Sequence, residues 1–134
     1  MKRLTAILLV ISLVGSIQIN AQENSRQGKL TIASCQFPIS DNINENYNRI
    51  KTQIIEAKLK GADIVHFSEC ALSGYVGTDF PNFEGYDWQR LKEESETIMS
   101  LAKELGIWVV LGSTHRLTKA NKPVSYTHLR AHET

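Results

Sequence analysis

In the segment between Ile43 and Ala57, apolar residues recur every three or four positions. This spacing predicts a helix with one buried face, which would form a layer over a sheet. Asn42, followed three residues later by Glu45, resembles a capping box and predicts the start of the helix. Gly61 predicts its end. The predicted buried face consists of Ile43, Tyr47, Ile50, Ile54 and Ala57.

A second helix is predicted from Asp87 to Leu105, with Gly106 as its stop. Its predicted buried face consists of Trp88, Leu91, Ser95, Ile98, Ala102 and Leu105. Short apolar runs precede and follow the helices, and we interpret them as strands within Lys29–Gln36, at Asp63–Ser68 and at Ile107–Leu111. The last run is continuously apolar, which predicts burial on both of its faces. The order strand, helix, strand predicts an α/β fold, with a right-handed crossover if the strands are parallel.

The first 28 residues differ in character from the rest of the chain. Lys2 and Arg3 precede a mostly apolar run, Leu4–Ile19, and Ala21 is a small residue suited to a cleavage site. This pattern predicts a secretory signal peptide at residues 1–21, followed by a polar junction at 22–28. We therefore expect an exported protein, periplasmic or secreted, with no stable membrane insertion after cleavage; an uncleaved membrane anchor is the alternative.

The charge of the chain points to no particular partner. The 134 residues carry a net charge of +1, and removal of Lys2 and Arg3 leaves 13 basic against 14 acidic residues. We expect no nucleic-acid binding, because there is no excess of basic residues. The two cysteines, Cys35 and Cys70, would be compatible with a disulfide in an oxidising compartment. We expect none, and we interpret both as structural, since their positions in and after different strands need not bring their Cβ atoms together.

Glu69 is the candidate catalytic residue. It follows the buried run Asp63–Ser68 directly and precedes the small-residue turn Leu72–Tyr75. The carboxyl ends of strands are where α/β proteins place their chemistry, and burial there can raise the pKa of a glutamate toward that of a general base. A structural role, as a helix cap or ion-pair partner, is the alternative.

Two further features are ambiguous. His66 lies within the second predicted strand, where a lone histidine is more often a hydrogen-bonded core residue than a catalyst. The irregular segment Val76–Tyr86 interleaves aromatic residues with glycine and proline. Such a loop after a catalytic strand suits a substrate wall, and it equally suits a loop held to the surface by its rings.

Four segments resemble the carbon-nitrogen hydrolases, the nitrilase/amidase superfamily, in order and spacing. They are Lys29–Gln36 (KLTIASCQ), Asn46–Ala57 (NYNRIKTQIIEA), Gly61–Tyr75 (GADIVHFSECALSGY) and Gly106–Ser113 (GIWVVLGS). The most specific part is the strand-Glu-x-x-x-(Ser/Thr)-Gly-Tyr element at Ile64–Tyr75. Ser68 stands where the family more often has proline. The resemblance covers residues 29–123.

The resemblance implies an α/β fold, the N-terminal part of a truncated four-layer αββα sandwich of the nitrilase type. It also implies a Glu-Lys-Cys mechanism acting on a small-molecule amide or nitrile, with no cofactor and no metal. Glu69 matches the glutamate, whereas no lysine or cysteine of this chain matches the other two motifs. We therefore expect the fragment alone to be inactive and the full-length protein to be a homo-oligomer.

The end of the sequence departs from the family pattern. The family continues with a hairpin whose partner strand begins soon after Pro123, and we expect no matching strand in Val124–Thr134 (VSYTHLRAHET). This tail resembles translated adapter sequence. His128 and His132 are four residues apart, but they lack the glutamate placement of a zinc-protease helix, so we expect no metal there. Two alternatives to the hydrolase stay open: an exported non-catalytic binding module on the same fold, and a metal-dependent phosphoesterase of similar architecture.

Overall fold

The computed structural model describes residues 28–116 and 124–130. The predicted signal peptide and most of the polar junction lie outside this range. The elements, in chain order, are β1 (Ile32–Cys35), α1 (Ile43–Leu59), β2 (Ile64–Phe67), α2 (Trp88–Leu105), β3 (Trp108–His115) and β4 (Val124–Arg130). The two predicted helices and three predicted strands are thus present, and the α/β class is confirmed.

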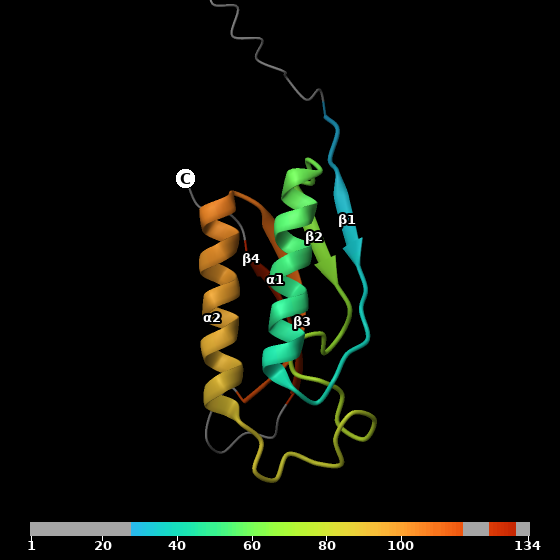
Figure 1. The fold of residues 1–134 in the computed structure, drawn as a ribbon, viewed down its shortest axis with the longest axis vertical. Coiled ribbons are helices and arrows are strands. Elements are labelled where there is room, and N and C mark those ends of the chain that lie inside the picture. The colour runs from blue at the N-terminus through green and yellow to red at the C-terminus, as the bar shows by residue number, and fades with distance from the viewer. Residues whose placement is uncertain (1–27, 117–123, 131–134) are drawn as a thin grey trace, which may run out of the picture.

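The four strands form one sheet in the order β1-β2-β3-β4. The first three are parallel, with Ile32 opposite Ile64 and Ile64 opposite Trp108. Both helices lie side by side over one face of the sheet (Figure 1). Their amino ends and the carboxyl ends of the parallel strands share the lower end of the molecule in that view, where the loop between β2 and α2 also lies.

The helices begin and end where the sequence predicts. Asn42 caps α1, and its Oδ1 accepts hydrogen bonds from the N–H groups of Asn44 and Glu45. Gly106 ends α2 in the left-handed conformation with φ 58°. The core between helices and sheet is built from Ile43, Ile50, Ile54, Ala57, Ala62, Val65, Phe67, Ala71, Leu72, Leu91, Ile98, Ala102, Ile107, Val109 and Leu111. Most of the predicted helix faces are therefore in the core.

The opposite face of the sheet is open in the described part of the chain. Ile32 is 58% exposed and Trp108 39% exposed, whereas Val65 and Val109, which point toward the helices, are 0% and 2% exposed. The prediction that Ile107–Leu111 is buried on both faces is therefore wrong. The reason is that both helices cover the same face, so within Ile107–Leu111 only alternate residues are buried, whereas Trp108 is exposed and Val110 partly so.

His66 lies on this open face and is exposed. The prediction of a hydrogen-bonded core histidine is wrong for the same reason, because the pleat directs His66 away from the helices while Val65 and Phe67 point toward them.

Strand β4 corrects the expectation that no strand occurs in Val124–Thr134. Residues Val124–Arg130 pair antiparallel with β3, from His115 opposite Val124 to Val109 opposite Arg130. The physical reason is visible in the sequence, since the segment contains Val124, Tyr126 and Thr127, which are residue types that strands favour. Residues 131–134 lie outside the described part of the chain.

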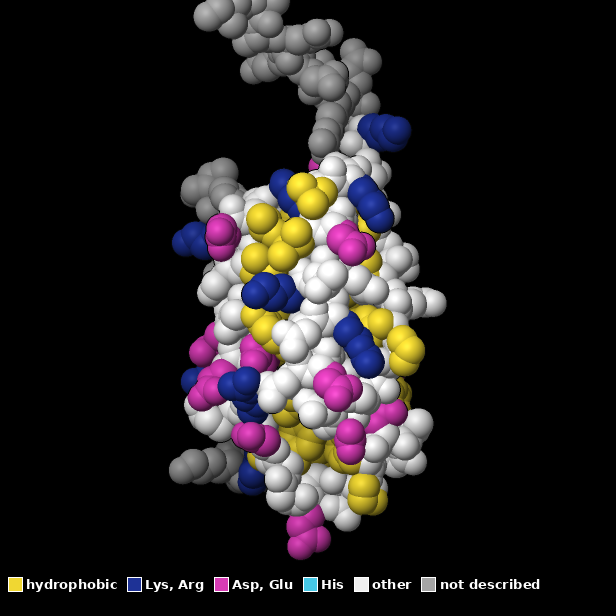
Figure 2. Space-filling model, in the orientation of Figure 1, with side chains coloured by type: hydrophobic (Ala, Val, Ile, Leu, Met, Phe, Trp, Pro, Cys, Tyr) yellow, Lys and Arg dark blue, Asp and Glu magenta, His cyan; other side chains and the backbone are white. Residues whose placement is uncertain are grey.

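The helix layer presents acidic and basic side chains in mixture (Figure 2). Several form ion pairs one helical turn apart, such as Lys92 with Glu96 at 3.5 Å and Arg90 with Glu94 at 3.1 Å. Exposed pairs such as Lys92 with Glu96 contribute little to stability individually, whereas Glu94 is buried. Across the described residues, neither helix is both long enough and apolar enough to cross a bilayer.

Candidate active site

Glu69 lies where the chain leaves the carboxyl end of β2, as predicted. Its side chain is exposed, while the five residues Cys70–Gly74 that follow it are buried. We call residues 68–75 the Glu69 turn. The acid thus reaches solvent from a turn whose next residues are packed inside the protein. This is the arrangement that can present a carboxylate to a substrate in a fixed position.

The first constraint on the Glu69 turn is a close backbone approach from β3. A Cβ added to Gly112 would lie 2.4 Å from the carbonyl oxygen of Ser68 and 2.6 Å from the Cα of Glu69. The N–H of Leu72 also donates to the carbonyl of Gly112 at 3.4 Å. Only glycine allows β3 to pass this close, so Gly112 determines where the Glu69 backbone lies.

Cys70 adopts a left-handed conformation with φ 53°, the only positive φ of a non-glycine residue in the described chain. Such a conformation costs of order 1–3 kcal/mol and is held by its surroundings. The Cys70 thiol is buried, with its Sγ 3.6 Å from the Oγ1 of Thr114. At this bend the thiol of Cys70 points into the protein, whereas the side chain of the preceding Glu69 is exposed. This geometry agrees with a structural role for the cysteine. Cys35 and Cys70 form no disulfide.

Buried hydrogen bonds that involve hydroxyl groups hold the second half of the Glu69 turn, around Ser73. The Oγ of Ser73 accepts from the N–H of Thr114 at 3.0 Å and lies 3.3 Å from its Oγ1. Tyr86 donates its hydroxyl proton to the carbonyl of Ser73 at 2.7 Å, and burial raises the pKa of Tyr86 well above its ordinary value. These contacts attach the turn to β3 and to the loop before α2.

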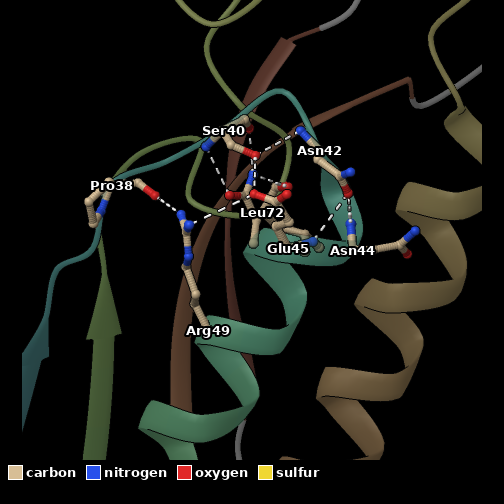
Figure 3. A network of polar contacts seen from close by, with 8 residues as sticks. Pro38, Ser40, Asn42, Asn44, Glu45, Arg49 and Leu72 are labelled. Atoms are coloured by element: carbon tan, nitrogen blue, oxygen red, sulfur yellow. Dashed lines mark hydrogen bonds and ion pairs between the residues drawn. The ribbon is translucent and has the colours of Figure 1, made fainter.

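Asn46 attaches the same turn to helix α1. Its side chain is fully buried, and its Nδ2 donates to the carbonyls of Ser40 and Leu72 at 2.7 and 3.2 Å. Its Oδ1 accepts from the N–H of Ser40 at 3.0 Å. The surrounding network is drawn in Figure 3, where Arg49 donates to the carbonyl of Pro38. One buried amide thus joins the loop after β1, the start of α1 and the Glu69 turn.

Tyr75, the last residue of the turn, contacts the candidate acid directly. Its hydroxyl donates to the Oε2 of Glu69 at 2.9 Å. The pKa of Tyr75 is raised, first because its hydroxyl is hydrogen-bonded to Glu69 and then because the carboxylate charge opposes ionisation of the phenol. The phenol therefore keeps its proton near neutral pH and remains a donor.

The aromatic residues after the turn pack mainly on one another. Ring centroids are 5.1 Å apart for Phe80 and Tyr86, 5.1 Å for Phe83 and Trp88, and 4.8 Å for Tyr86 and Trp88. Of the two readings of Val76–Tyr86, this cluster supports a loop held in place by its rings.

The sequence predicts the position of Glu69 at the end of β2, but it does not predict the residues that fix the turn around it. Gly112 has a recognisable signal, because a glycine that interrupts an apolar strand often marks a close backbone approach. Asn46 lies three residues after Ile43 and four before Ile50, so the sequence places it on the apolar face of the helix but does not show which groups its amide would bond. Among the described residues, no three His, Cys, Asp or Glu side chains are grouped so that they could hold a metal ion.

Together these features define an α/β protein with a rigidly held strand-end carboxylate, and comparison with known proteins gives the family. The sequence profile of the carbon-nitrogen hydrolase family matches residues 31–129. The chain belongs to this family. The match continues past Pro123, where we expected the resemblance to end.

Curated relatives and solved structures agree with this assignment. The chain is 37% identical to omega-amidase NIT2-A of Xenopus laevis and 39% identical to omega-amidase NIT2 of Xenopus tropicalis, each over 86 residues that make up 63% of this chain. The matched region spans 30% of the length of each of these relatives.

Among solved structures, an amidase from Nesterenkonia sp. superposes with a TM-score of 0.65 at 17% identity, covering 77% of this chain and 38% of that one. A double mutant of the amidase from Nesterenkonia sp. AN1, in complex with acrylamide, gives a TM-score of 0.68 at 16% identity over 80% of this chain and 40% of that one. These likenesses establish the fold: the described residues form part of the nitrilase-type sandwich, with one helix layer and one sheet.

Proposed function

We propose that this chain contributes the general-base glutamate, Glu69, to an exported enzyme that hydrolyses small-molecule amides. The observation that carries the proposal is the position of Glu69, exposed at the carboxyl end of β2 on a turn fixed from three sides. The named relatives are amidases, which favours an amide over a nitrile as the substrate.

The mechanism follows from ordinary covalent catalysis by an activated thiol. Glu69 accepts the proton of a cysteine thiol, and the thiolate attacks the amide carbon. A lysine ammonium stabilises the oxyanion of the tetrahedral intermediate. Glu69 then gives its proton to the departing amine or ammonia, leaving a thioester. Glu69 next takes a proton from water, whose oxygen attacks the thioester and releases the acid and the thiol. The cysteine and lysine are expected from other parts of the full-length protein.

Replacement of Glu69 by glutamine in the full-length protein tests the assignment. Glu69→Gln keeps the shape and removes the proton acceptor, so turnover should fall by about 10²- to 10⁴-fold. Because the side chain is exposed, the melting temperature should stay close to that of the wild type. Turnover and thermal melting are measured on the same purified sample.

Glu84→Gln is the matched control, since Glu84 is an exposed glutamate on the loop at the same end of the molecule. It should change neither turnover nor melting temperature. Near-normal turnover in folded Glu69→Gln would refute the catalytic role. A large loss of stability with retained activity would instead identify Glu69 as a structural ion-pair partner.

Export is the second part of the proposal and rests on the sequence alone. The basic Lys2 and Arg3, the apolar Leu4–Ile19 and the small Ala21 form the pattern of a cleaved signal peptide. N-terminal sequencing of the protein from the cell envelope should begin near residue 22, and a retained Met1 would contradict cleavage.

A further inference from the structure

The contact between Tyr75 and Glu69 closes a ring within one short stretch of chain. The hydroxyl of Tyr75 donates to the Oε2 of Glu69 at 2.9 Å, and the two residues are six positions apart. Both side chains are exposed, so the hydrogen bond is made at the surface where a substrate would approach. A bond at such a position persists only if the backbone of both partners is held.

The backbone of Tyr75 is held by the loop that follows it. Its N–H donates to the Oδ2 of Asp79 at 2.7 Å, and its carbonyl accepts from the N–H groups of Thr78 and Asp79 at 3.1 and 2.8 Å. The N–H of Gly77 donates to the carbonyl of Phe80 at 2.7 Å. Residues 75–80 therefore form a closed loop that starts at Tyr75 and ends in the aromatic cluster. With Ser73 and Gly74 buried on the other side, the backbone of Tyr75 is held beside Glu69.

We propose that Tyr75 is a positioning residue, whose phenol holds the carboxylate of Glu69 in one orientation and stabilises its negative charge. This inference rests on the proposed role of Glu69 as general base. A donor fixed on Oε2 sets the plane of the carboxylate and hence the direction of Oε1, and a general base must be aligned with the proton that it takes. Hydrogen bonding to the ionised form of an acid also favours that form.

Removal of the phenol should change the pH dependence of the reaction in one direction. Loss of the phenolic donor destabilises the ionised carboxylate, which raises the pKa of Glu69, so a higher pH is needed to deprotonate it. Other ionisable groups near the turn include Cys70 within it, Asp79 on the loop and Tyr86 behind Ser73. His115 and Arg116 follow Thr114, which contacts the turn from β3. The change of Tyr75 to phenylalanine replaces none of these groups. A difference in the pH profile between the variant and the wild type therefore measures the effect of the Tyr75 hydroxyl on Glu69.

The experiment compares Tyr75→Phe with the wild type in the full-length protein, over the pH range in which kcat/KM rises. We expect kcat to fall by about tenfold, the order of effect for one hydrogen bond to a charged group. We expect the acidic limb of the kcat/KM profile to move to higher pH by up to about one unit. The melting temperature should be unchanged, because Tyr75 is exposed.

Tyr47→Phe is the matched control, because it removes the same atom from a tyrosine on α1 and should leave both kcat and the acidic limb unchanged. An unshifted limb in Tyr75→Phe overturns the positioning role, and so does a loss confined to KM, which would make Tyr75 a substrate contact. The two proposals fail separately: inactive Glu69→Gln with an unshifted Tyr75→Phe limb removes only this inference, whereas active, folded Glu69→Gln removes the proposed function itself.

Discussion

At the scale of single residues, Gly112 determines the position of Glu69 although it has no side chain. We expect Gly112→Ala to lower stability by about 1–3 kcal/mol, because the new methyl group meets the backbone of Ser68 and Glu69, which cannot turn aside as a side chain would. Since the displaced atoms include the Cα of Glu69, turnover of the remaining folded protein should also fall. Thermal melting and single-turnover kinetics of the full-length variant measure the two effects.

Gly85→Ala provides the contrast. Nothing lies within 4 Å of a Cβ at Gly85, but its φ of 69° disfavours alanine, so this variant should lose of order 1 kcal/mol of stability without loss of turnover. If Gly112→Ala behaved in the same way, the close approach to Glu69 would be without consequence for the site.

The candidate acid itself was predictable from the sequence, because an apolar run that stops at a carboxylate has a local signature. The residues that hold the Glu69 turn in place were not predictable, because each of them acts through a contact between segments that are distant in the sequence. Asn46 and Leu72 are 26 residues apart, and Ser73 and Thr114 are 41 apart. The strained φ of Cys70 has no signature either, since cysteine is not a residue type that favours the left-handed region.

At the scale of elements, Asn46 couples helix α1 to the Glu69 turn. We expect Asn46→Ala to destabilise the protein by about 1–3 kcal/mol, because the change leaves the carbonyl of Leu72 and the backbone groups of Ser40 without their buried partner. The turn should loosen as well, so turnover at a temperature where the variant is folded should decrease.

The control for this change is Asn48→Ala, an exposed asparagine on the same helix. It should be neutral in a urea melt and in turnover. An equal loss of stability in both variants would contradict the role of the buried amide, because alanine favours a helix more than asparagine does and the exposed change should cost nothing.

Helices α1 and α2 were predictable from the spacing of their apolar residues, because each has one apolar face and clear start and stop residues. Strand β4 was missed for a different reason. Its residue types favour a strand, but their polarity gives no clear apolar face, and its place in the sheet is set by pairing with β3 rather than by a hydrophobic pattern.

At the scale of the whole molecule, the register of the sheet explains its uncovered face. Ile32, Ile64 and Trp108 stand opposite one another across β1, β2 and β3, so they form one continuous apolar row. A second row beside it consists of Ser34, His66 and Val110. In a four-layer sandwich this face would pack against a second sheet, at a spacing of about 10 Å. The continuous apolar run in β3 is therefore expected for a strand that is covered on both faces, as in the complete sandwich, although only one face is covered by the described residues.

The exposed apolar row on the sheet leads to a prediction for residues 22–134 by themselves, without the apolar run Leu4–Ile19, which would bind dye on its own. With Ile32 58% and Trp108 39% exposed, the isolated chain should bind the dye ANS and self-associate, since contiguous exposed apolar surface drives association. Replacing both residues by threonine, which strands accept, should reduce dye binding and the apparent mass in sedimentation. Leu59→Thr is the control, because it removes an 81% exposed apolar side chain from helix α1 and leaves the sheet face unchanged. A soluble monomer that binds no dye and melts in one sharp transition would contradict the assigned exposure of this face, and an equal effect of Leu59→Thr would place the associating surface on the helices instead.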